Sequence, residues 1–132
     1  MIVQLKIIGG FFVVLAVLHF FFPRYFGWNS DLKPLSLINR QMMWVHTFFL
    51  AFIVFLMGLL CLFETQALLN TDLGQSICIG LGVFWGLRLL VQFFGYSSKL
   101  WRGKIFETSV HIVFILIWGY LTFLFLWIGF VL

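Results

Sequence analysis

The chain has 132 residues, of which 64% are hydrophobic and 9% are charged, and its formal net charge is +4. A water-soluble domain carries about a quarter charged residues, so the composition excludes a water-soluble globule. The basic residues lie in short loops and not on one polar face, which argues against a nucleic-acid-binding protein. The sequence holds no zinc-type cysteine pattern, no glycine-rich phosphate loop and no serine-nucleophile elbow.

Four apolar stretches predict one transmembrane domain over residues 1–132, an all-α integral membrane four-helix bundle. We expect its helices at about residues 5–22, 41–63, 75–96 and 105–131, each close to the roughly 20 residues that a helix needs to cross a bilayer. No alternating pattern supports a β-barrel. Pro23 and Glu64 are expected to end the first two helices. The first stretch lacks a small-residue cleavage site, so we interpret it as a span and not as a signal peptide.

Basic residues concentrate in the first and third loops, which four spans place on one side of the membrane. These residues are Arg24, Lys33, Arg40, Lys99, Arg102 and Lys104, against Lys6 alone on the other side. The positive-inside rule therefore predicts cytoplasmic loops and two extracytoplasmic termini. Trp28, Trp44 and Trp101 fit an aromatic belt at the same boundary. We expect the membrane to be a bacterial inner (plasma) membrane.

Polar residues within the spans gather in the predicted cytoplasmic half, within about 12 Å of the boundary. The expected polar cluster consists of His19, Arg40, His46, Arg88, Gln92, Glu107 and His111. Ionisable groups are costly inside a membrane and should face the bundle interior or a water-filled cavity. The cluster is therefore the candidate ligand site, although polar side chains also hold transmembrane helices together through hydrogen bonds.

Arg88 needs a partner because its guanidinium cannot lose its proton. We expect Glu107, near the start of the fourth helix, or a bound anion to neutralise it. The three histidines and Glu107 also allow a metal site, and His46 with His111 could serve as axial ligands of a haem. No HExxH motif is present. Haem and quinone both stay open as cofactors, and neither is assigned.

Two further features concern packing. Cys61 and Cys78 lie near the predicted outer face and are candidates for a disulfide, with two buried thiols as the alternative. Gly82 and Gly86 follow the small-xxx-small pattern of close helix contact, within the chain or in a dimer.

A faint repeat pairs the two halves of the chain, since Val45-His46 and Val110-His111 open the second and fourth helices alike.

The segment Leu18-His19-Phe20-Phe21-Phe22-Pro23-Arg24-Tyr25-Phe26 resembles the corresponding helix end of DoxX-like small four-helix membrane proteins. The resemblance covers this helix end and the number of spans. It implies an accessory membrane component beside a redox enzyme, and no catalytic residue can be transferred from it.

Two classes of function follow. The first is an accessory or assembly subunit of a larger membrane complex, with the link to a redox enzyme that the resemblance implies. Its expected partners are the lipid bilayer and other membrane subunits or further copies of the chain. The alternative is a ligand-handling membrane protein that binds haem, quinone, lipid or an ion at the polar cluster. We place the subunit slightly ahead, and a non-enzymatic role ahead of an enzymatic one.

Overall fold

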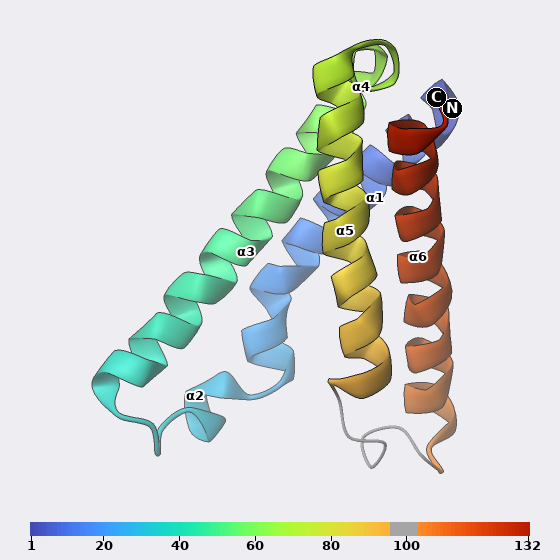
Figure 1. Ribbon diagram of the computed structural model, residues 1–132. Coiled ribbons are helices and arrows are strands. Elements are labelled where there is room, and N and C mark those ends of the chain that lie inside the picture. The colour runs from blue at the N-terminus through green and yellow to red at the C-terminus, as the bar shows by residue number, and fades with distance from the viewer. Residues whose placement is uncertain (96–102) are drawn as a thin grey trace. The chain divides into compact units, whose positions relative to one another are not determined.

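The computed structural model describes residues 1–95 and 103–132 (Figure 1). Its four long helices are α1 (Ile2–Tyr25), α3 (Leu37–Phe63), α5 (Asp72–Phe94) and α6 (Ile105–Phe130). Two short helices, α2 (Trp28–Asp31) and α4 (Thr65–Asn70), lie in the connections. These residues contain no strand, which confirms the predicted all-α class.

All four long helices are long and apolar enough to cross a membrane, with mean hydropathies between 1.9 and 2.5 over their most apolar windows. A helix satisfies its own backbone hydrogen bonds, which lipid cannot do. The chain is therefore an integral membrane protein with four candidate spans. Its orientation in the membrane stays a prediction. That prediction depends in part on three residues that lie outside the described part of the chain: Lys99, Trp101 and Arg102.

The expected end of the first helix at Pro23 is wrong. Pro23 lies inside α1, which continues to Tyr25. Proline removes only its own backbone N–H, and the turn is closed by the Phe26 N–H, which donates to the Phe22 carbonyl at 2.9 Å. Pro23 cannot donate to the His19 carbonyl, so the helix continues past the proline with one backbone hydrogen bond missing.

Hydroxyl caps explain why α3 and α5 begin earlier than the apolar pattern predicts. The Asn39 N–H donates to the Ser36 Oγ at 3.4 Å, and the Gly74 N–H donates to the Thr71 Oγ1 at 2.9 Å. Each bond satisfies a backbone donor that the first turn of a helix leaves without an intrahelical partner. The helices therefore start at Leu37 and Asp72, ahead of their most apolar segments.

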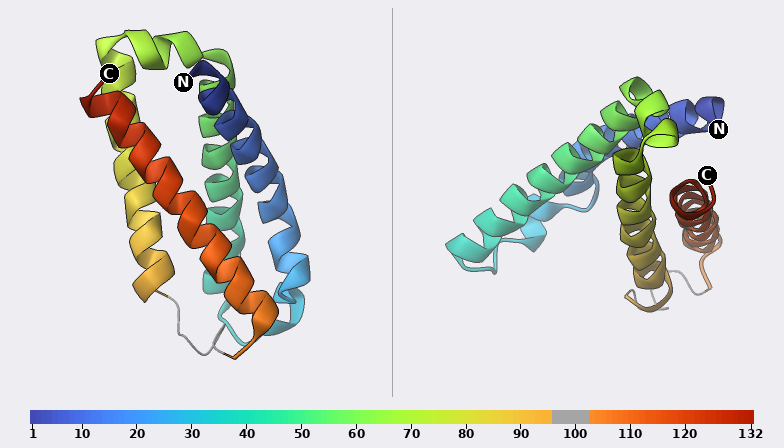
Figure 2. Two further views of the ribbon diagram at one scale, coloured as in Figure 1. Left: turned by 90° about the vertical axis from the view of Figure 1, so that its right-hand side faces the viewer. Right: turned by 45° about the horizontal axis from the view of Figure 1, so that its top comes forward.

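The chain divides into two compact units, Met1–Gln66 and Ala67–Leu132, which we name the N-terminal and C-terminal hairpins. In the N-terminal hairpin α1 packs against the antiparallel α3, and α2 lies in the turn between them (Figures 1 and 2). The two helices approach closely where Gly9 faces Gly58. A Cβ added at either glycine would lie 2.8 Å from the carbonyl oxygen of the other.

In the C-terminal hairpin α5 packs against the antiparallel α6 (Figure 2). A Cβ built on Gly82 would meet the Leu126 Cδ2 at 2.6 Å, and one built on Gly86 would meet the Thr122 Cγ2 at 3.4 Å. Both glycines of the small-xxx-small pattern therefore serve contact between α5 and α6 within one chain. This contact fixes the register that brings the polar residues of the two helices together.

Candidate functional site

Three polar side chains of the C-terminal hairpin form one hydrogen-bonded chain, which we name the Arg–Gln–His cluster. The Arg88 Nη1 donates to the Gln92 Oε1 at 3.3 Å, and the Gln92 Nε2 lies 2.8 Å from the His111 Nδ1. Arg88 and Gln92 share one face of α5 because they are four residues apart. His111 approaches that face from α6. Of the seven residues expected to converge, the structure brings these three together.

The order of donors and acceptors in these hydrogen bonds follows from Arg88, because a guanidinium can only donate hydrogen bonds. The carbonyl of the Gln92 amide must therefore face Arg88, and its NH2 group must face His111. The His111 Nδ1 then accepts, and a neutral imidazole carries its proton on Nε2. Both ends of the cluster consequently present hydrogen-bond donors, the guanidinium on α5 and the imidazole Nε2–H on α6.

Burial of Gln92 makes the cluster part of the helix interface. Gln92 is 7% exposed, and Thr65 is the other buried polar or charged residue of the described chain. Arg88 and His111 are half-buried on either side of Gln92. A buried amide that kept no hydrogen bonds would be costly, so both partners of Gln92 stabilise its position between α5 and α6.

Aromatic rings cover the side of the cluster toward the middle of the hairpin. The Arg88 Cζ lies 5.3 Å from the centroid of the Trp118 ring, within the range of a cation–π interaction. The Trp118 ring stacks on Trp85 at 4.9 Å with an interplanar angle of 11°, and on Phe114 at 5.3 Å and 16°. Trp85, Trp118 and Phe114 were not predicted from the sequence, since in a phenylalanine-rich chain only their spacing from His111 and Arg88 could have distinguished them.

Glu107 does not lie beside Arg88 in this register. Glu107 is exposed in the first turn of α6, eleven residues before Trp118, which places it about 16 Å along the helix axis from the ring that Arg88 covers. An arginine side chain does not span that separation together with its contact to Trp118. Arg88 instead contacts Gln92 and Trp118, and its neutralisation by Glu107 or by a bound anion stays a prediction.

The expected members from the N-terminal hairpin bond to their own helices. The His19 Nδ1 donates to the Leu15 carbonyl and the His46 Nδ1 donates to the Met42 carbonyl, each at 2.7 Å. His19 is half-buried and its ring packs at 4.8 Å from Phe22, whereas His46 is exposed. Arg40 lies half-buried in the first turn of α3. Convergence of these three residues with the Arg–Gln–His cluster stays a prediction.

The grouping of possible metal ligands bears on the metal hypothesis alone, and haem stays open as a cofactor. Within residues 1–95 and 103–132, no three His, Cys, Asp or Glu residues are grouped closely enough to hold a metal ion. Cys61 and Cys78 are both buried, each within its own hairpin, and their pairing in a disulfide stays a prediction.

Comparisons of the chain with protein-family models, with curated proteins and with solved structures found no match. The fold and the cluster by themselves describe an integral membrane protein with a polar site between two apolar helices. The resemblance to DoxX-like proteins stays a prediction.

Proposed function

We propose that this protein is a ligand-handling membrane protein whose C-terminal hairpin binds the head group of a membrane-soluble molecule, in the first place a quinone. The observation that carries the proposal is the directed chain from Arg88 through Gln92 to His111. It places hydrogen-bond donors on both α5 and α6, at a depth where lipid supplies none. The complementary ligand presents acceptor oxygens.

The surroundings of Arg88 favour a flat, apolar head group with carbonyl oxygens. Trp85, Trp118 and Phe114 form a stack of nearly parallel rings beside the guanidinium. Ligand sites of this kind combine aromatic walls with a few placed polar groups. Trp85 and Trp118 are buried and Phe114 is half-buried, so a quinone ring would extend the stack at Phe114, and its carbonyl oxygens match the guanidinium and the imidazole N–H. An anionic lipid head group would match the donors but not the flat stack.

A second candidate function is the accessory subunit of a membrane complex. The observation that favours it is the surface of α3, of which only Ala51, Val54, Gly58 and Cys61 are buried. Phe48, Phe49 and Phe52 are exposed on the same helix, and the Phe48 and Phe52 rings stack at 6.4 Å. Such a surface can contact lipid or another transmembrane helix. A photoactivatable residue at Phe49 should crosslink to one discrete protein if the chain is a subunit, and to lipid alone otherwise.

The ligand proposal is tested by titrating the protein in lipid nanodiscs with a short-chain quinone and following tryptophan fluorescence. Wild type should show saturable quenching, because Trp118 and Trp85 lie beside the site. Arg88→Gln should weaken binding by about tenfold or more, the effect of losing a charge-assisted hydrogen bond. Lys6→Gln removes the same charge from the exposed Lys6 of α1 and should change nothing.

Helix content and thermal stability of Arg88→Gln separate ligand binding from a purely structural role. A variant that binds quinone like wild type but unfolds more easily would show that Arg88 only holds the helices together. A Soret band in the purified protein would show haem instead and would contradict the quinone proposal.

A further inference from the structure

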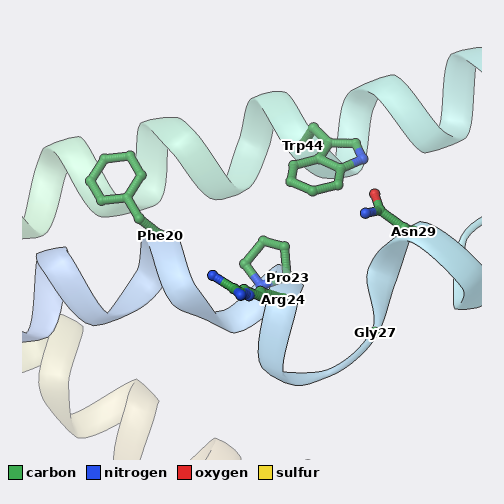
Figure 3. A pocket seen from close by; sticks show the side chains of 6 residues that line it. All are labelled: Phe20, Pro23, Arg24, Gly27, Asn29 and Trp44. Carbon is green, nitrogen blue, oxygen red and sulfur yellow. The ribbon is translucent and has the colours of Figure 1, made fainter.

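A pocket of about 340 Å³ lies at the turn of the N-terminal hairpin, and the Arg–Gln–His cluster does not account for it. Its lining comes from three helices and the turn between two of them: Phe20, Pro23 and Arg24 of α1, Gly27, Asn29 of α2, and Trp44 of α3 (Figure 3). The pocket therefore lies where the apolar part of α1 ends.

The local sequence builds this pocket in a definite way. Pro23 is buried, whereas Arg24, Asn29 and Trp44 are exposed around it. Gly27 has a φ of 68°, a left-handed conformation that reverses the chain after α1 and brings α2 back toward α3. Trp28 meets Trp44 edge to face at 5.5 Å. Arg24 and Phe20 lie on one side of Pro23, with Trp44 and Asn29 on the other (Figure 3).

The chemistry of the lining is that of an anion site with an apolar border. Arg24 supplies a permanent positive charge with five N–H donors, and the Asn29 amide adds two more. Among the described residues that line the pocket there is no carboxylate, and Asp31, the acidic residue of α2, is not one of them. Phe20, 61% exposed, lies on the membrane side of Arg24 along α1 and offers an apolar surface to an acyl chain.

We propose that this pocket binds the phosphate group of a glycerophospholipid, with Arg24 holding the phosphate oxygens and Phe20, on the same side of Pro23, contacting the acyl chains. Phosphate matches a guanidinium well, because two of its oxygens can accept parallel N–H hydrogen bonds from it. A phospholipid also satisfies both the polar rim and the apolar border, whereas a soluble phosphate ester satisfies only the rim. The lipid would fasten the turn between α1 and α3 to one leaflet.

Native mass spectrometry of the full chain in mild detergent tests the proposal, with phosphatidylglycerol as the probe. Wild type should retain one lipid molecule per chain. Diacylglycerol with the same acyl chains lacks the phosphate and should not be retained. Glycerol phosphate, which lacks the chains, should not displace the lipid at equal concentration. Displacement by glycerol phosphate would show a site for soluble phosphate esters and would overturn the lipid proposal, as would equal retention of diacylglycerol.

Substitutions then locate the bound lipid. Arg24→Gln should lower occupancy by about tenfold or more, as expected for the loss of a charge-assisted hydrogen bond. Lys33→Gln removes an equal charge from an exposed residue of the same connection that does not line the pocket, and should leave occupancy unchanged. Equal losses in the two variants would show diffuse attraction to basic residues and would overturn the proposal.

Two observations keep the test decisive. The comparison of lipid, diacylglycerol and glycerol phosphate uses wild type alone, so it stands even if Arg24→Gln fails to fold. Loss of the adduct in Arg88→Gln, with retention in Arg24→Gln, would place the lipid at the Arg–Gln–His cluster and overturn the assignment to this pocket. That result would not by itself decide whether a quinone binds the cluster.

Discussion

The crossing of α1 and α3 at Gly9 and Gly58 supports a quantitative prediction about the N-terminal hairpin. In Gly58→Ala the new methyl group would lie 2.8 Å from the Gly9 carbonyl oxygen and 2.9 Å from the Val13 Cγ2. The carbonyl belongs to the backbone of α1 and cannot rotate away. The two helices must therefore move apart along their contact.

The loss of stability in Gly58→Ala follows from the size of that movement. Atoms that line a gap of about 0.5–1 Å lose a quarter to a half of their dispersion energy across it. Overpacking of this kind typically destabilises by about 1–3 kcal/mol. A loss of about 2 kcal/mol corresponds to an approximately 30-fold rise in the population of the opened hairpin. Gly10→Ala is the matched control, because its methyl group would meet no atom within 4 Å.

The thiol of Cys61 provides the assay. Cys61 is 0% exposed and lies about one turn after Gly58 on α3. In a Cys78→Ala background, its alkylation by a membrane-permeant maleimide should follow the population of opened hairpin when opening and closing are fast. Alkylation should accelerate about 30-fold in Gly58→Ala and stay at the wild-type rate in Gly10→Ala. Equal rates in the two variants would refute the close crossing.

Three further predictions concern the turn, the cluster and the topology. Gly27→Ala should destabilise the N-terminal hairpin by about 1–2 kcal/mol through its positive φ, and Gly27→Asn by less because asparagine tolerates that conformation; equal thermal shifts would contradict this. Gln92→Leu and His111→Leu should be coupled by about 0.6–1.7 kcal/mol in a double-mutant cycle of unfolding, and additive effects would show that their hydrogen bond contributes nothing. A reporter enzyme that is active only outside the cytoplasm should be active when it is fused to either terminus. A cytoplasmic C-terminus would overturn the predicted orientation.

The number and approximate place of the long helices were predictable because lipid allows few alternatives. A span needs a long apolar run with internal hydrogen bonds, and such runs are visible in composition alone. The ends of the helices were less predictable, since they depend on single bonds. The Ser36 and Thr71 caps and the closure of the turn after Pro23 each involve one or two hydrogen bonds. The short helices α2 and α4 carry no apolar period long enough to detect.

The candidate site was predictable in part for a similar reason. Arg88 and Gln92 share a helix face by spacing alone, and burial cost required an interior partner for Arg88. The identity of the facing residues depended on the register of α6 against α5. That register is set by the contacts of Gly82 with Leu126 and of Gly86 with Thr122. The sequence alone therefore suggested Glu107 for a place beside Arg88 that Trp118 occupies.

Photolabelling with an azido-quinone tests the central claim most directly, because it reports where a quinone binds. In membranes containing the wild-type chain, the label should attach to peptides of α5 around Arg88 and of α6 between His111 and Trp118. Excess unlabelled quinone should abolish that labelling, and Arg88→Gln should reduce it by about tenfold. Labelling spread evenly over all four long helices and insensitive to excess quinone would contradict the account.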